Sequence, residues 1–150
     1  MNKANKLNKL KNIKKEKEII NMKIYRCNIC GNMFVVIDDR KVVPKCCDQD
    51  MEILSANETD GAIEKHVPKV TRNENEIYVE VGELPHPMVP EHYIMMIALE
   101  TDRGVYIRYL TSSDSPTAMF KIGNNETPIK VYEYCNVHSL YSKDLNNNEE

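Results

Sequence analysis

VEVGELPHPMVPEHY, at residues 79–93, joins two strand-like segments through a loop that carries two histidines. Apolar and polar residues alternate before the loop, which is typical of a strand with one buried face. An apolar run follows it at residues 93–99. Three prolines stiffen the loop, because proline fixes φ and removes a backbone donor. His86 and His92 are therefore expected to adopt few arrangements.

The other two histidines, His66 and His138, also lie at strand edges, and Cys135 precedes His138 by three residues. A single histidine is more often a hydrogen-bonded surface residue than a ligand, and a single cysteine is often a small buried apolar group. Here, however, every histidine and the one spare cysteine fall in loops or at strand ends of one segment. Four imidazoles and one thiolate suit a transition metal. We predict a metal site from His66, His86, His92, Cys135 and His138, and spacing alone leaves its metal open.

A second group of candidate ligands consists of Cys27 and Cys30, followed by the adjacent pair Cys46 and Cys47. The Cys-x-x-Cys-Gly turn points two thiolates and the backbone N–H groups between them toward one spot, and Gly31 takes the φ that other residues avoid. Four thiolates form a tetrahedral cage suited to zinc or iron, and spacing does not choose between the two metals. Two neighbouring side chains cannot both point in relaxed directions, so we expect a distorted tetrahedron.

With 150 residues, of which 41% are hydrophobic, the chain can form one ordinary domain or a small domain plus a medium one. No apolar run approaches the roughly 20 residues needed to span a bilayer, and no apolar signal region follows the lysine-rich start. We therefore expect a cytoplasmic protein without a membrane partner. In that compartment, closely spaced cysteines are more often metal ligands than disulfides.

The net charge of −3 conceals an asymmetry, because residues 1–23 hold eight lysines and two glutamates while the rest of the chain is acidic. A basic arm on an acidic body is one way to contact nucleic acid. The arm has no aromatic residues interleaved with its lysines, and the chain shows no docking motif for nucleic acid. We expect no nucleic-acid partner.

The pattern of short strands and polar turns predicts an all-β protein. The expected hairpin turn lies at residues 38–41, after a strand at 33–37. The other expected strands lie at residues 23–26, 67–72, 76–81, 93–100, 105–110, 117–122 and 129–134.

Four parts of the chain are expected. Residues 1–22 form a basic polar extension, either disordered or a frayed helix. Residues 23–57 form a small four-cysteine domain, and residues 58–142 form a β-sandwich. Residues 143–150 form a polar tail, and we expect the chain to be loose from Ser142 onward.

These motifs resemble those of the desulfoferrodoxins, or two-iron superoxide reductases, over residues 22–141. The segment CNICGN at 27–32, with Cys46, Cys47 and the QDM that follows at 49–51, is similar to their desulforedoxin-type domain. The other matching segments, which resemble their superoxide reductase domain, are EKHVP at 64–68, VGELPHPM at 81–88, EHYI at 91–94 and EYCNVH at 133–138. Three departures stand out: Asp48 and Ser139 replace a common glycine, and Tyr141 replaces a usual tryptophan.

The resemblance implies a rubredoxin-like or desulforedoxin-like domain followed by an immunoglobulin-like sandwich, with two irons per chain. Cys27, Cys30, Cys46 and Cys47 would hold one iron. The four histidines would hold the second iron in a square plane, with Cys135 as the axial ligand and the sixth position open.

The implied activity is the one-electron reduction of superoxide to hydrogen peroxide. Lys65 would attract superoxide, and Glu64 would cap the ferric iron after turnover. The implied partners are a rubredoxin or similar electron donor and a second copy of the chain. The sequence leaves two alternatives to this activity open: an electron-transfer module, and a structural metalloprotein with zinc in the four-cysteine site.

Overall fold

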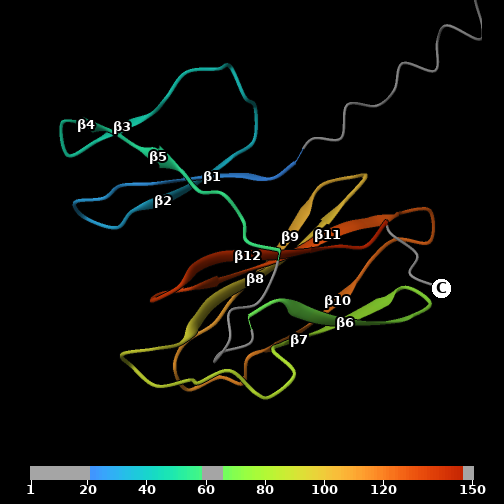
Figure 1. Cartoon of the computed structure of the whole chain (residues 1–150). Helices are drawn as coiled ribbons and strands as arrows, with labels where there is room; N and C mark the ends of the chain where they lie inside the picture. Colours follow the sequence, from blue (N-terminus) through green and yellow to red (C-terminus); the bar gives the residue numbers. More distant parts are fainter. Residues whose placement is uncertain (1–20, 59–65, 147–150) are drawn as a thin grey trace, which may run out of the picture.

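The computed structural model describes residues 21–58 and 66–146, and these parts of the chain contain strands and turns but no helix (Figure 1). No helix there is long and apolar enough to cross a membrane. The strands are β1 Lys23–Arg26, β2 Met33–Val36, β3 Lys45–Cys46, β4 Gln49–Asp50, β5 Glu52–Ile53, β6 Pro68–Asn73, β7 Glu76–Val81, β8 Ile94–Thr101, β9 Val105–Tyr109, β10 Thr117–Lys121, β11 Pro128–Cys135 and β12 Ser139–Asp144.

Seven of these strands form a sandwich of two antiparallel sheets, in the orders β10-β7-β6 and β12-β11-β8-β9 (Figure 1). Alternate residues of each strand point between the sheets, as strand geometry requires. The core between the sheets consists of Ile77, Val79, Val81, Ile94, Ile97, Leu99, Ala118, Phe120, Ile122, Val131 and Cys135. The predicted all-β class is confirmed, and the sandwich follows the smaller N-terminal cysteine domain.

The central strands of the four-stranded sheet, β8 and β11, are largely buried on both faces, which explains why β8 begins as an unbroken apolar run at residues 94–99 rather than an alternating one. The outer face of this sheet packs against the N-terminal domain, whose sheet has the order β2-β1-β5. Met22 and Ile24 lie against Met96, Ala98 and neighbouring tyrosines of the sandwich. The apolar contact joins the two parts of the molecule.

Strand β12 corrects the expectation that the chain is loose from Ser142. Residues 139–144 pair with residues 130–135 of β11, from Cys135↔Ser139 to Lys130↔Asp144. The segment has a polar composition, yet it alternates: Leu140 is 2% exposed and Ser142 is fully buried. Two buried positions are too few to produce a recognisable strand pattern in the sequence. The strand forms because it pairs with β11, and such tertiary pairing cannot be seen in the local sequence.

The hairpin expected at residues 38–41 is also wrong. Among residues 21–58 and 66–146, strand β2 pairs with β1 alone, and no strand is assigned between it and β3 at Lys45. The Asp39 carboxylate instead accepts hydrogen bonds from the ammonium groups of Lys23 and Lys41, which fastens the loop to β1. These two lysines hold the pKa of Asp39 well below its usual range. Charge pairing, rather than strand pairing, organises this loop.

Candidate metal centres

The four cysteines of the N-terminal domain converge on one point, with all four sulfur atoms within 4.8 Å of one another. Cys27 follows β1, Cys46 ends β3, and Cys47 lies in the turn between β3 and β4. The Sγ atom of Cys46 is 3.5 Å from that of Cys30 and 4.0 Å from that of Cys47. The backbone closes the first turn, since Gly31 donates its N–H to the carbonyl of Cys27 at 3.0 Å.

The adjacent ligands place strain in the backbone. Cys47 and Asp48 have φ values of 51° and 59°, and they link the paired residues Cys46 and Gln49. Two successive positive φ values are typical of the tight type I′ hairpin turn, which favours asparagine and glycine. Cys47 adopts this conformation without glycine's freedom, at a cost of about 1–2 kcal/mol. This backbone conformation places the sulfur of Cys47 beside that of Cys46.

The shifted pKa values of these thiols indicate that the site suits a cation. Backbone N–H groups of Cys30 and Ile29 lower the pKa of Cys27 to about 6. The sulfurs of Cys30 and Cys27 raise the pKa of Cys47 to about 12. Four thiolates this close repel one another, so they can ionise together only around positive charge. A tetrahedral metal ion satisfies this requirement.

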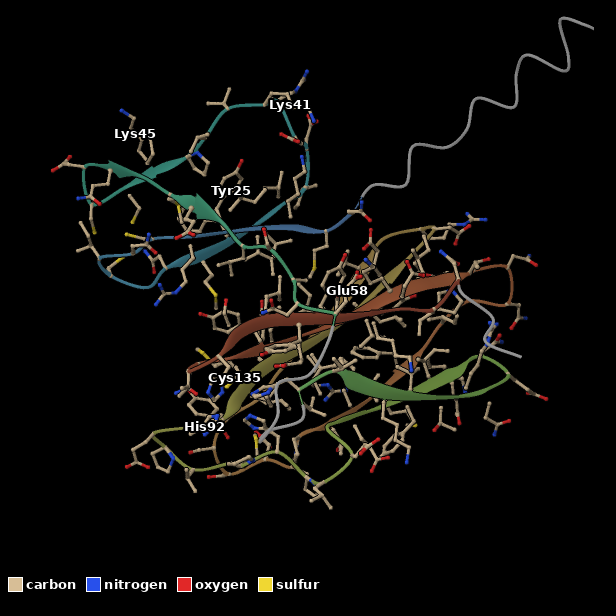
Figure 2. All side chains as sticks on the ribbon, in the orientation of Figure 1. Tyr25, Lys41, Lys45, Glu58, His92 and Cys135 are labelled. Atoms are coloured by element: carbon tan, nitrogen blue, oxygen red, sulfur yellow. The ribbon has the colours of Figure 1, made fainter. Side chains whose placement is uncertain are left out.

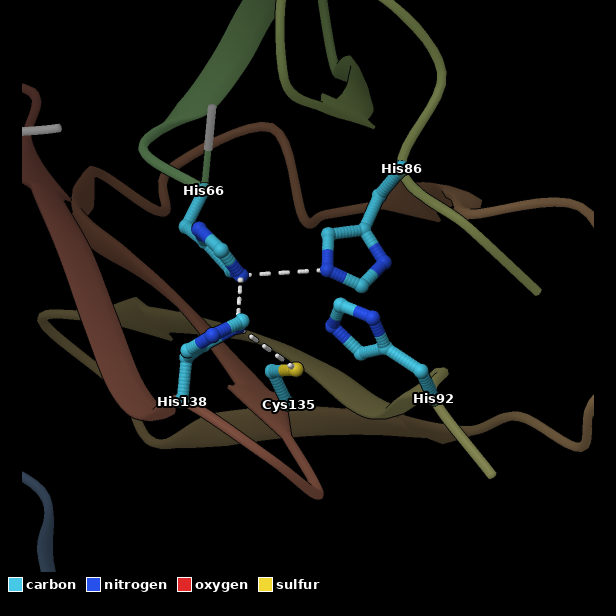
Figure 3. A group of neighbouring side chains, drawn as sticks. All are labelled: His66, His86, His92, Cys135 and His138. Atoms are coloured by element: carbon cyan, nitrogen blue, oxygen red, sulfur yellow. Dashed lines mark hydrogen bonds between the residues drawn. The ribbon is translucent and has the colours of Figure 1, made fainter. Parts of the chain in front are cut away.

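The second group of ligands meets at one end of the sandwich, where Figure 2 shows Cys135 and His92. His66 lies just before β6, and both His86 and His92 come from the loop between β7 and β8. Cys135 ends β11, and His138 precedes β12. One ligand atom from each of these five residues lies within 4.8 Å of the others, although the residues span most of the sandwich sequence (Figure 3).

The four imidazole rings occupy the corners of a near-square. Neighbouring ring centroids are 4.7 Å apart for His66–His86, His86–His92 and His66–His138, and 5.0 Å apart for His92–His138. The diagonal from His66 to His92 is longer, at 6.5 Å. Neighbouring rings are steeply inclined to each other, by 65° to 88°. Cys135 is fully buried and enters from the sandwich interior.

The ring nitrogens that face one another can be named. His66 Nε2 is 3.1 Å from both His86 Nε2 and His138 Nδ1 (Figure 3). The Nδ1 atom of His86 is 2.7 Å from the carbonyl oxygen of Pro87, so this nitrogen carries the proton and donates it. The Nε2 atom of a neutral His86 therefore points a lone pair at the centre. Convergent lone pairs in a buried cluster suit a metal.

Asn136 was not among the predicted site residues, yet its hydrogen bonds connect the two loops that carry ligands. Its side-chain oxygen accepts the N–H of Tyr93 at 2.8 Å, and its backbone N–H donates to the carbonyl of Tyr93 at 3.2 Å. Its side-chain amide also donates to the Glu91 carbonyl at 3.1 Å. Glu91 and Tyr93 flank His92, so Asn136 fixes this ligand relative to Cys135. The one hint of this role in the sequence was the position of Asn136 between the candidate ligands Cys135 and His138.

Comparison with known proteins identifies the family. A family model described as desulfoferrodoxin matches residues 58–144. The desulfoferrodoxin of Syntrophotalea carbinolica is 37% identical over 123 residues, covering 82% of this chain and 96% of the relative. The chain belongs to the desulfoferrodoxin family. A desulfoferrodoxin homolog of Methanothermobacter thermautotrophicus is 41% identical over 118 residues, 79% of this chain and 94% of the relative.

Two further similarities concern the N-terminal part and the whole fold of this chain. Residues 1–88 match a model described as membrane iron-sulfur containing protein FtrD-like, and this range includes the four-cysteine group. The crystal structure of the superoxide reductase from Treponema pallidum has a TM-score of 0.72 and 25% identity, covering 82% of this chain and 98% of that one. The N-terminal domain and the sandwich thus occur together in a solved structure.

The donor atoms at the sandwich end fit iron. Five ligands exceed the four of a closed structural zinc site, and four imidazoles with a thiolate suit a redox metal with an open position. The two remaining predicted site residues, Lys65 and Glu64, lie outside the described residues. The structure therefore brings together all nine predicted ligands, in two groups.

Proposed function

We propose that this chain is a superoxide reductase. It would convert one superoxide, one electron and two protons into one hydrogen peroxide. The observation that carries the proposal is the near-square of imidazoles with Cys135 among them at the end of the sandwich. The fold similarity to the Treponema pallidum superoxide reductase supports it. When bound by His66, His86, His92, Cys135 and His138, iron would supply a one-electron couple and an open coordination position.

The chain's own residues would set the properties of the centre. The four rings would supply nitrogen donors to the metal, and the buried Cys135 would supply a thiolate from the sandwich side. A thiolate ligand and the burial around it are established means of tuning an iron potential. His66 and His86 are 2% and 4% exposed, whereas His138 is exposed, so solvent reaches one side of the group. Substrate and protons would enter from that side.

Lys65 and Glu64 belong to the proposal as residues beside His66 in the sequence. Lys65 would draw the superoxide anion toward a chain whose body is acidic, because local positive charge raises encounter rates by ~10–10³-fold. Glu64 would approach the centre when the substrate position is empty. Both roles come from the family resemblance.

The four-cysteine group would hold a second iron, which makes two irons per chain. A rubredoxin or similar small protein would return the electron, and the chain would act as a homodimer. Zinc in place of the second iron would leave the superoxide reaction at the histidine centre intact. It would remove any electron relay through the cysteines.

Activity and metal content of three variants test the proposal. His66→Ala and Cys135→Ser should lower superoxide consumption by more than ~100-fold, since changes in outer-sphere residues alone cost 10–100-fold. Both should retain metal at the four-cysteine site. Cys46→Ser is the matched control, which should lose that metal and keep the histidine centre.

Iron analysis and optical spectra of the reduced and oxidised proteins would accompany the assay. Wild-type rates in both His66→Ala and Cys135→Ser would reject the assigned active site. A wild-type chain with two redox-active irons and no superoxide consumption would instead indicate an electron-transfer module. Zinc as the sole bound metal would indicate a structural metalloprotein.

A further inference from the structure

His66 holds a central place among the ligands, yet the strand ladder does not hold it. Its Nε2 atom lies 3.1 Å from ring nitrogens of two other ligands, His86 and His138. It precedes β6, whose first residue is Pro68. The orientation of its ring therefore depends on side-chain contacts, because rotation about the Cβ–Cγ bond would move Nε2 away from the other donors.

Tyr141 supplies such a contact. Its ring stacks on the His66 imidazole with a centroid separation of 4.6 Å and an interplanar angle of 18°. The ligand neighbours of His66 meet it edge-on, at 65° and 76°, so Tyr141 is the nearly parallel partner in close contact. A flat ring against the imidazole face opposes the rotation that would misdirect Nε2.

The backbone of Tyr141 is held on both sides. Strand β11 pairs with it on one side, through Glu133↔Tyr141. Asn57 covers the other side: its N–H donates to the Leu140 carbonyl at 2.9 Å, and its carbonyl accepts the Ser142 N–H at 2.8 Å. The Asn57 side-chain amide also donates to the Leu140 carbonyl, at 3.3 Å. Tyr141 thus lies between two bonded neighbours in what would otherwise be an edge strand.

Asn57 is joined to the four-cysteine domain by a short connection. Leu54, three residues earlier, donates its N–H to the carbonyl of Ile24 in β1 at 2.8 Å. Strand β5, directly before Leu54, pairs with Tyr25 and Arg26 of β1. The cysteine domain, Asn57, β12 and the His66 ring therefore form one continuous series of contacts.

We propose that Tyr141 is a positioning residue for His66, and that Asn57 makes this positioning depend on the four-cysteine domain. Tyr141 holds the imidazole plane so that Nε2 faces the other four donors. Asn57 keeps the Tyr141 backbone in place by bonding its two neighbours. The inference rests on the metal-binding part of the proposed function and not on the superoxide reaction.

Anaerobic titration of the full chain with Fe²⁺ against a competing chelator tests the role of Tyr141. Tyr141→Met fills the space without a flat ring, and we expect ~10–100-fold weaker Fe²⁺ binding at the histidine centre, the range seen for groups that orient ligands. The absorption band that arises from the Cys135 sulfur and the iron should also shift. Tyr141→Phe keeps the ring and should match wild type in both measurements. The four-cysteine site should be unchanged in each variant.

Asn57→Pro tests the connection, because it removes both amide donors to Leu140 and keeps the Asn57 carbonyl. We expect weaker Fe²⁺ binding at the histidine centre, by less than in Tyr141→Met. Asn57→Ala keeps the backbone bonds and is the control. Tyr141→Leu provides a second flat-ring deletion should Tyr141→Met not fold.

Wild-type affinity and spectrum in a folded Tyr141→Met or Tyr141→Leu protein would overturn the positioning role. Wild-type affinity in Asn57→Pro would overturn the connection to the cysteine domain. Weaker Fe²⁺ binding in Tyr141→Met, in a chain whose wild type does not consume superoxide, would leave the positioning role standing and reject the proposed function.

Discussion

The two candidate metal centres are built in different ways. The four-cysteine group comes from one segment, Cys27 to Cys47, in which short turns bring the sulfurs together. The histidine group collects ligands from His66 to His138, and it exists only when β6, β8, β11 and β12 are correctly paired. The first centre stores its strain locally, at Cys47 with φ 51°. The second centre depends on hydrogen bonds between its ligand-bearing loops, such as those of Asn136 to Glu91 and Tyr93.

This difference shows that a metal site depends on as much of the fold as its ligands span. A site within one short segment needs only its own turns. A site with distant ligands shares the free energy of unfolding of the whole sandwich. Changes in the sandwich core should therefore affect the two centres unequally.

The largest effect is expected from Ile97→Ala. Ile97 is fully buried between the sheets, next to β11. Truncation of a buried isoleucine leaves a cavity and lowers the free energy of unfolding by about 2–5 kcal/mol. Urea unfolding followed at the absorption bands of both centres should show the histidine centre lost at lower urea and the cysteine centre shifted less. Ile37→Ala, at a side chain 95% exposed, is the control. Equal shifts at both centres would contradict the distinction.

An intermediate effect is expected from Glu126→Gln, at the end of the sandwich away from the histidines. Its carboxylate accepts hydrogen bonds from the Thr101 hydroxyl at 2.6 Å, the Tyr106 hydroxyl at 2.8 Å and the Gly123 N–H at 3.0 Å. Hydrogen bonds to a charged group contribute about 1.5–3 kcal/mol. Glutamine removes the charge and one of the two acceptor oxygens, so part of this free energy should be lost near neutral pH, and the unfolding midpoint of the histidine centre should fall although Glu126 lies far from it.

The pH dependence gives the Glu126 prediction its sign. The Thr101 hydroxyl and then the Gly123 N–H lower the pKa of Glu126. Its stabilising contribution is therefore fully present above the unfolded-state pKa of about 4.3, and it is lost as the pH falls through the lower folded-state pKa. The difference between wild type and Glu126→Gln should shrink in acid. Glu74→Gln, in an exposed turn, is the control. A difference that grew in acid would contradict the assignment.

The smallest change in stability is expected when glycine replaces the positive-φ residue that follows a ligand in each centre. Ser139, at φ 71°, follows His138, and Asp48, at φ 59°, follows Cys47. Ser139→Gly should stabilise the sandwich by about 0.5–1 kcal/mol, since relief of left-handed strain exceeds the entropy cost of glycine. Asp48→Gly should gain less, because aspartate tolerates this conformation better. Thermal unfolding measures both changes.

The reverse substitution is the control for this pair. Gly82→Ala, at φ 83°, places a side chain where glycine's freedom is required and should destabilise the sandwich. Destabilisation by Ser139→Gly would show that the serine side chain contributes more than its backbone costs.

The sequence predicted more about the ligands than about their arrangement. Strand β7 has the predicted bounds, because its alternation reflects one buried face. The nine ligands could be named because cysteine and histidine are few and closely spaced. The near-square of rings was expected only from the family resemblance, because residue spacing alone does not reveal strand pairing across more than 70 residues. The contact of Tyr141 with His66 was missed for the same reason, along with β12 itself.

The central strands β11 and β8 of the four-stranded sheet are covered on both sides, which constrains how such a protein can be shortened. Met96, Ala98, Tyr132 and Tyr134 lie under the N-terminal domain. A sandwich without the N-terminal domain would expose these residues to water as one contiguous hydrophobic patch, which would favour aggregation. Any single-domain descendant of this chain would therefore have to replace these four residues with polar ones, or recruit another molecule to cover them.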